Sequence, residues 1–245
     1  MIFKVNLKDF LKKFIVPLID MNKGGKFPLF IRDNKLWSIC SSTSVGNRMF
    51  LYSEYNLPDV SEPVERFNIN LETLKRGLDC IKTTEPFVEF SLNNGVLSYK
   101  DSNIRFNIRC LQDSIVAVPK VNVIELEKWP IDYMFTISEE QIGNIIKAIT
   151  FLGKNKDSKI YVESEDGKIS LFFGDRESKS SDGITIPICD VGSQFTPRIF
   201  DISIFDPFDT KSGDITFKIY TNGTASMETK EDNNKQVYIT TSLKK

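Results

Sequence analysis

Two stretches of the chain share one pattern of apolar and polar positions. Phe67–Ile81 and Phe135–Ile149 align without a gap at an offset of 68 residues (135 minus 67). In each stretch, alternating apolar residues predict a strand, and apolar residues spaced four and then three apart predict the buried stripe of a helix. Asn70 and Ser138 stand at the junction as predicted N-caps. The expected buried stripes are Leu74, Leu78 and Ile81 in the first stretch and Ile142, Ile146 and Ile149 in the second.

The pattern recurs less completely at both ends of the chain. The stretch from Phe3 aligns with the one from Phe67 at an offset of 64 residues (67 minus 3), with Phe10 and Phe14 in its helical stripe. Pro17 is expected to end that helix, because proline lacks the backbone N–H that a helix interior needs. A fourth copy begins at Phe200, with Ser203 at the cap position and room for about one helical turn.

Each predicted helix is followed by two apolar-rich strands around a polar turn. The turns are Arg32–Lys35, Asn93–Gly95, Glu165–Gly167 and Asn222–Gly223. Asn-Gly and Asp-Gly dipeptides match the twist of a β-hairpin. The repeated unit is therefore strand-helix-strand-strand, and the fold class is α+β.

Four copies of this unit pair into two similar domains, 1–112 and 133–245, joined by a connector at 113–132. The connector contains Pro119 and Pro130 and has little helical periodicity, so we expect it to be extended. It is also rich in Val, Ile and Leu, whereas a solvated linker would be polar. We therefore expect it to lie along the protein surface with its apolar side buried.

Composition narrows the possible functions. The chain has 245 residues, a net charge of -1 and a sequence pI near 5.8, so any contact with DNA requires a segregated basic surface. It contains no histidine, which excludes Ser-His-Asp chemistry and histidine-bound zinc. No metal or other cofactor is expected, and nothing in the sequence indicates an enzyme.

The remaining sequence features predict a cytoplasmic location. Cys40, Cys80, Cys110 and Cys189 lie far apart without a CxxC pair, which is typical of reduced, structural thiols. No signal peptide and no apolar stretch of membrane-spanning length is apparent.

The repeated Phe-x-Ile-Asn/Ser openings at Phe67 and Phe135, the Asn-Gly and Asp-Gly hairpins and the shortened copy from Phe200 to Tyr220 resemble the DNA sliding clamps. In length and in the reduced last helix, the chain is most similar to the clamps of T-even-type tailed phages, which share the fold of PCNA. The resemblance covers essentially the whole chain as a pattern of elements, and no short motif within it is diagnostic alone.

The resemblance implies a homotrimer closed head to tail into a ring that encircles duplex DNA without sequence preference. Such a ring is the processivity factor of phage DNA replication, because it tethers the replicative polymerase and makes its rebinding intramolecular. A phage-encoded clamp would act in the host cytoplasm. The subunit interface would join edge strands, with Ile104–Arg109 and Ile184–Ile188 as candidates.

Such a ring requires cations on the helix faces opposite the apolar stripes, where they would contact phosphates. A simpler explanation remains open, since every amphipathic helix has a charged outer face. Counting about 100° per residue, the candidates opposite the stripes are Lys8, Lys12, Arg76 and Lys147, with Lys13, Lys75 and Lys82 beside them.

The resemblance also implies that polymerase and clamp-loader subunits insert short, apolar-anchored peptides beside the connector. Trp129 is the strongest single candidate, because tryptophan is favoured at binding hot spots. The alternative is that the apolar connector only completes the core. The candidate pocket residues are Val118, Pro119, Val121, Ile124, Leu126, Trp129, Pro130 and Ile131, with Tyr238 from the last strand.

Two other functions compete with a clamp. A duplicated β-rich domain would also suit a phage structural protein of the tail or baseplate. A metal-dependent nuclease using scattered carboxylates is the weakest alternative, because the sequence shows no acidic cluster at comparable strand ends.

Overall fold

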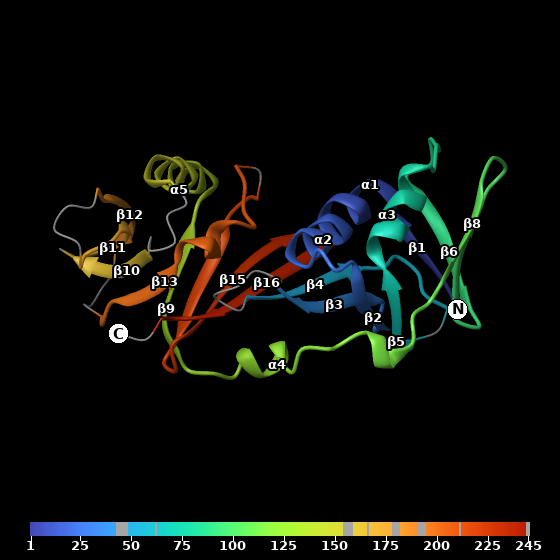
Figure 1. Ribbon diagram of the computed structural model, residues 1–245, viewed down its shortest axis with the longest axis horizontal. Helices are drawn as coiled ribbons and strands as arrows, with labels where there is room; N and C mark the ends of the chain where they lie inside the picture. Colours follow the sequence, from blue (N-terminus) through green and yellow to red (C-terminus); the bar gives the residue numbers. More distant parts are fainter. Residues whose placement is uncertain are drawn as a thin grey trace. The chain divides into compact units, whose positions relative to one another are not determined.

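The computed structural model describes residues 1–42, 49–61, 63–153, 159–165, 167–177, 182–190, 195–210 and 212–243 (Figure 1). The fold is α+β, and its elements follow the four predicted copies in order. Asp166, at the tip of one predicted hairpin, lies outside the described residues.

The first copy has a longer helical segment than predicted. It comprises β1 (Ile2–Asn6), α1 (Leu7–Asp9), the π-helical η1 (Phe10–Ile15), α2 (Val16–Met21), β2 (Lys26–Arg32), β3 (Lys35–Ser41) and β4 (Phe50–Asn56). The expectation that Pro17 ends the helix is wrong, since α2 continues to Met21. The wider, π-helical turn of η1 precedes Pro17 and ends with an i to i−5 hydrogen bond from Val16 N–H to the Leu11 carbonyl. Pro17 therefore lies in the first turn of the next helical segment, α2, where its missing N–H is tolerated.

The second copy matches its prediction closely. It comprises β5 (Val64–Asn70), α3 (Leu71–Asp79), β6 (Phe87–Asn93), β7 (Val96–Lys100) and β8 (Arg105–Arg109). The side chain of Asn70 caps α3 by accepting a hydrogen bond of 2.9 Å from Thr73 N–H. The predicted stripe of Leu74, Leu78 and Ile81 is buried.

The third copy comprises β9 (Ile131–Ile137), α5 (Glu139–Leu152), β10 (Lys159–Glu165), β11 (Lys168–Gly174) and β12 (Ile184–Asp190). Ser138 caps α5, and Gln141 completes a capping box. The buried stripe of α5 is Ile142, Ile145 and Ala148, whereas Ile146 and Ile149 are half-buried. The predicted stripe is therefore wrong after Ile142, because a run of isoleucines fits two neighbouring stripes and only packing on the sheet selects one.

The fourth copy is the shortest in its helix, as predicted. It comprises β13 (Arg198–Asp201), the 3-10 turn η3 (Ile202–Phe205), β14 (Ile215–Tyr220), β15 (Thr224–Glu231) and β16 (Asn234–Thr241). The cap is Asp201, whose carboxylate accepts from Ser203 N–H at 2.9 Å, so the expectation of a cap at Ser203 is wrong. Each copy carries one strand beyond the predicted unit, namely β4, β8, β12 or β16.

The chain forms two compact units. Unit 1 contains the described residues of Met1–Ser44, Phe50–Asn122 and Lys230–Val237, and unit 2 contains Met49 and those of Val123–Thr229 and Tyr238–Lys245. The tip of the β15–β16 hairpin therefore packs in unit 1, although the rest of the fourth copy lies in unit 2.

Unit 1 encloses its core between two antiparallel sheets. One sheet has the strand order β1-β6-β7-β8, and the other has β5-β2-β3-β4, with the start of β16 next to β4. Helices α1, α2 and α3 lie close together in this unit (Figure 1). Aromatic rings fill its interior, with Phe3 stacked on Phe90 and Phe10 on Phe14 at centroid distances of 5.6 and 5.4 Å.

Unit 2 repeats this plan. One sheet has the order β12-β11-β10-β13, and the strands β15-β14-β9 are neighbours in the other. Phe217 lies at the centre of its core, stacked on Phe135 at 5.1 Å and meeting Phe200 edge-on at 5.9 Å. In each unit, one strand predicted as an edge ends a four-stranded sheet: β8 in unit 1 and β12 in unit 2.

Candidate nucleic-acid and partner interfaces

The candidate cations of the first copy differ in their surroundings. Lys8 and Lys12 are exposed on the outer side of the helix whose other side buries Phe10 and Phe14. Lys13 is half-buried, and its ammonium contacts the carboxylates of Asp9 at 3.6 Å and Glu231 at 2.5 Å. The hydrogen bond to Glu231 is the main reason that the pKa of Lys13 is raised.

The candidates on and after α3 include one ion pair. Lys75 is half-buried and pairs with Asp79 one turn later at 2.8 Å, an interaction that solvent screens. Arg76 is exposed and donates through Nε to the Glu72 carbonyl at 3.3 Å, and Lys82 is exposed in the segment that follows.

In unit 2, Lys147 is exposed on α5, away from the buried Ile145 and Ala148. Five of the seven candidates, Lys8, Lys12, Arg76, Lys82 and Lys147, are thus exposed on or next to helices. Exposed, flexible cations of this kind suit contact with phosphates but carry no information about base sequence.

The first half of the connector is fixed to unit 1 by two side chains of β5. Asn68 donates through Nδ2 to the Asp113 carboxylate at 2.5 Å, and Arg66 donates to the Val116 carbonyl at 2.7 Å. These bonds hold the 3-10 turn η2 (Asp113–Ile115), and Val116 is buried. The sequence alone did not indicate Arg66 and Asn68, because their i, i+2 spacing on a strand places them on one face but does not specify which residues they bind.

The second half of the connector is fixed to unit 2. It contains the short helix α4 (Val123–Leu126), and Thr221 N–H donates to the Pro130 carbonyl at 3.1 Å. The Trp129 ring meets the ring of Tyr220 edge-on, with centroids 5.8 Å apart. Tyr220 is a third residue that the sequence alone did not indicate, because it stands only as the last apolar residue of the predicted strand that begins at Ile215.

The predicted pocket residues fall into three groups by exposure. Leu126 and Tyr238 are buried, and Tyr238 meets the Phe208 ring edge-on at 4.8 Å, so both belong to the core of unit 2. The half-buried residues, all in unit 1, are Val118, Pro119 and Val121. The exposed ones, all in unit 2, are Ile124, Trp129, Pro130 and Ile131.

The described ranges also bear on metal binding, thiol chemistry and membrane insertion. They contain no group of three or more His, Cys, Asp or Glu side chains that could hold a metal ion. All four cysteines are free thiols, with Cys40 buried and Cys80 exposed. None of the helices in these ranges is both long enough and apolar enough to cross a membrane.

The fold is that of the DNA sliding clamps. Neither a protein-family model nor a curated protein sequence matches the chain. Among solved structures, PCNA of A. fulgidus, bound to the C-terminal region of FEN-1, aligns with a TM-score of 0.74 and 12% identity over 100% of this chain and 98% of that one.

Bacterial clamps share the fold as well. The DNA polymerase III subunit beta of Pseudomonas aeruginosa aligns with a TM-score of 0.71 and 11% identity over the whole of this chain. The beta clamp of Helicobacter pylori bound to a DNA ligase peptide aligns with a TM-score of 0.65 and 10% identity. This chain spans 65% of the Pseudomonas aeruginosa subunit and 67% of the Helicobacter pylori clamp. At such identities the likeness establishes the fold and leaves function to be argued from the residues.

Proposed function

We propose that this protein is a sliding clamp: a homotrimeric ring that encircles duplex DNA and tethers a replicative polymerase. The observation that carries the proposal is the alignment of the entire chain with clamp structures, including 98% of a PCNA chain. The chain itself makes and breaks no bond in this function. The ring confines the polymerase near its template and so raises its effective concentration there.

Head-to-tail closure would use the two sheet edges. Each of β8 and β12 has a neighbouring strand on only one side within its four-stranded sheet, so its other side can pair with a strand of a second copy. Three subunits joined in this way would present to the DNA backbone the cations on or next to the helices: Lys8, Lys12, Arg76, Lys82 and Lys147. The partners proposed are the polymerase and clamp-loader subunits, bound through apolar-anchored peptides beside the connector.

We further propose that this function belongs to phage DNA replication, in the cytoplasm of the host, as the resemblance to T-even-type phage clamps implies. The length of the chain and its reduced fourth helix, η3, support that assignment. A tail or baseplate protein gains no support from any contact described above.

Solution mass and polymerase stimulation test the proposal together. We expect a mass about three times that of the 28.0-kDa chain, measured by sedimentation equilibrium. We also expect longer products from the associated polymerase on primed circular DNA when the loader is present. A strictly monomeric protein without effect on product length would overturn the proposal.

A further inference from the structure

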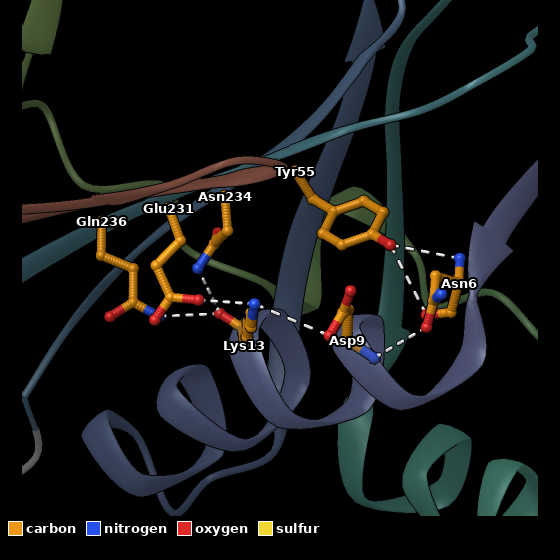
Figure 2. A network of polar contacts seen from close by, with 7 residues as sticks. All are labelled: Asn6, Asp9, Lys13, Tyr55, Glu231, Asn234 and Gln236. Atoms are coloured by element: carbon orange, nitrogen blue, oxygen red, sulfur yellow. Dashed lines mark hydrogen bonds and ion pairs between the residues drawn. The ribbon is translucent and has the colours of Figure 1, made fainter. Parts of the chain in front are cut away.

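The carbonyl oxygen of Lys13 has an unusual environment, because the residue four positions later is Pro17. Proline has no N–H, so the usual α-helical donor to that carbonyl is absent. Two side-chain amides donate in its place. Asn234 Nδ2 and Gln236 Nε2 each lie 2.7 Å from the Lys13 carbonyl oxygen (Figure 2).

Both amides come from β16 and belong to unit 1, as does the helix. Asn234 and Gln236 are two residues apart, so they share one face of the strand and converge on the same oxygen. Each is only 8% exposed. A carbonyl oxygen with two lone pairs can accept both bonds, and a buried amide without a partner would be costly.

The ammonium of the same residue binds the same hairpin. Figure 2 shows Lys13 between Asp9 on its own helix and Glu231 at the end of β15. The Lys13 side chain is 26% exposed and faces two carboxylates, so its charge is already compensated within unit 1. Lys12, the preceding residue, is exposed and forms no ion pair within the described part of the chain.

The tip of the hairpin is also attached to β4, which fixes its position. Asn56 N–H donates to the Asn233 carbonyl at 2.8 Å, and Asn56 Nδ2 lies 3.5 Å from the Asp232 carbonyl. The tip, Glu231–Gln236, is thus anchored to the sheet of unit 1 on one side and bound to the helix on the other.

We propose that Glu231–Gln236 is a clip, a segment that holds the helical segment Leu7–Met21 in place next to Pro17. In this proposal Lys13 binds the clip and does not contact DNA phosphate. Lys13 is then a positioning residue, which keeps Lys8 and Lys12 oriented outward. The part concerning DNA rests on the proposed clamp function, whereas the clip itself depends only on unit 1.

The clip is tested first by the thermal stability of the full chain. The double substitution Asn234→Ala and Gln236→Ala should lower Tm by roughly 4–10 °C, as expected for two lost, partly buried hydrogen bonds in a chain of this size. In a Pro17→Ala background, the restored N–H can donate to the Lys13 carbonyl. In that background the double substitution Asn234→Ala and Gln236→Ala should therefore lower Tm by less than half as much.

The matched control is Asn93→Ala, which removes an exposed amide beside another hairpin turn and should leave Tm within about 1 °C, as is usual for surface substitutions. An equal loss of Tm in both backgrounds, or no loss in either, would overturn the clip.

The role of Lys13 toward DNA is tested by the salt dependence of binding to a short duplex, measured by fluorescence anisotropy. Lys12→Gln should reduce the slope of log K against log salt by about 0.9, the value for one phosphate contact. Lys13→Gln should leave that slope unchanged. Glu231→Gln, which releases Lys13, should steepen it.

The outcomes separate the two proposals. Equal reductions of the slope by Lys12→Gln and Lys13→Gln would overturn the positioning role and leave the clamp function intact. If substitution of neither Lys8 nor Lys12 changes the slope, the DNA-facing assignment fails, and the Tm comparison still decides the clip.

Discussion

The ring of Trp129 meets the ring of Tyr220 edge-on at a centroid distance of 5.8 Å, which anchors the end of the connector to β14. Trp129 is 36% exposed, so it combines a packed side with a surface that a partner could contact. Its neighbour Pro130 accepts a hydrogen bond from Thr221 N–H, which strengthens the same attachment. The residue proposed as the main peptide anchor therefore has a structural role within the chain.

The ring contact and the proposed binding role together lead to a prediction about Trp129→Ala. Loss of the edge-on ring contact and of the buried part of the indole should lower the free energy of unfolding by about 1–3 kcal/mol. Ile124→Ala serves as the comparison, because that side chain is 70% exposed and its loss should change stability by no more than about 0.5 kcal/mol. Urea denaturation measures both. Both variants should bind the associated polymerase more weakly in calorimetry, and unchanged binding by Ile124→Ala would remove it from the proposed pocket.

A second prediction concerns the charges at the proposed subunit edges. Arg105 and Arg109 on β8 are exposed and form no ion pair among the described residues, and the same holds for Asp190 on β12. If β8 of one copy pairs with β12 of the next, the double change Arg105→Glu and Arg109→Glu places like charges together. Association of subunits, followed by sedimentation, should then weaken by about tenfold or more.

The matched control for this charge reversal is Arg32→Glu, at the exposed β2–β3 turn, which should leave the mass unchanged. Adding Asp190→Lys to the β8 variant should restore part of the association. A trimer that is indifferent to all of these changes would indicate that other surfaces form the interface.

A third prediction separates two functions of Gln141. This side chain accepts a hydrogen bond from Ser138 N–H in the capping box and donates to the Ile188 carbonyl of β12 at 2.7 Å. Ser138→Ala should cost about 1 kcal/mol of unfolding free energy, the usual value for a lost N-cap. Gln141→Ala should cost more, about 1–3 kcal/mol, since it also leaves a strand carbonyl without its donor.

Chemical denaturation checks this order, with Asn144→Ala on the exposed side of α5 as the control. Equal losses for Ser138→Ala and Gln141→Ala would mean that the bond to Ile188 contributes nothing measurable.

A fourth prediction concerns thiol reactivity. Cys40 is 4% exposed, and burial raises its pKa to about 12, so little of the reactive thiolate exists near neutral pH. Burial also raises the pKa of Cys110 and Cys189, whereas Cys80 is exposed. In native protein treated with iodoacetamide at about pH 8, close to the ordinary thiol pKa, Cys80 should react first and Cys40 last.

Mass spectrometry of digested samples identifies the modified thiols, and unfolding in guanidinium should expose all four equally. Early modification of Cys40 in the native protein would contradict its placement in the core.

Local chemistry explains which elements could be predicted from the sequence. The caps at Asn70 and Ser138 depend on side chains within four residues of the helix start. The turn at Asn93–Gly95 depends on residues that tolerate positive φ, and Asn94 and Gly95 have φ values of 49° and 70°. These interactions are encoded in short stretches, so their pattern repeats visibly along the chain.

Interactions between residues far apart in the sequence explain why two predictions, the helix end at Pro17 and the buried stripe of α5, were wrong. The helix continues past Pro17 because of a π-helical turn, and the carbonyl four residues earlier accepts from Asn234 and Gln236, more than 200 residues away in sequence. The stripe of α5 depends on the sheet beneath it, which selects Ile145 in place of Ile146. Neither outcome is contained in the local pattern.

The sequence by itself thus determined the fourfold repeat, the α+β class and the seven helix-associated cations as candidates. Tertiary structure decided that Lys13 is bound within unit 1 while Lys12 remains exposed, although the two are adjacent in the chain. The physical reason is that amphipathic periodicity fixes only the direction in which a side chain points. Whether a charge meets solvent or an opposite charge depends on which distant strand packs beside it, here the end of β15 at Glu231.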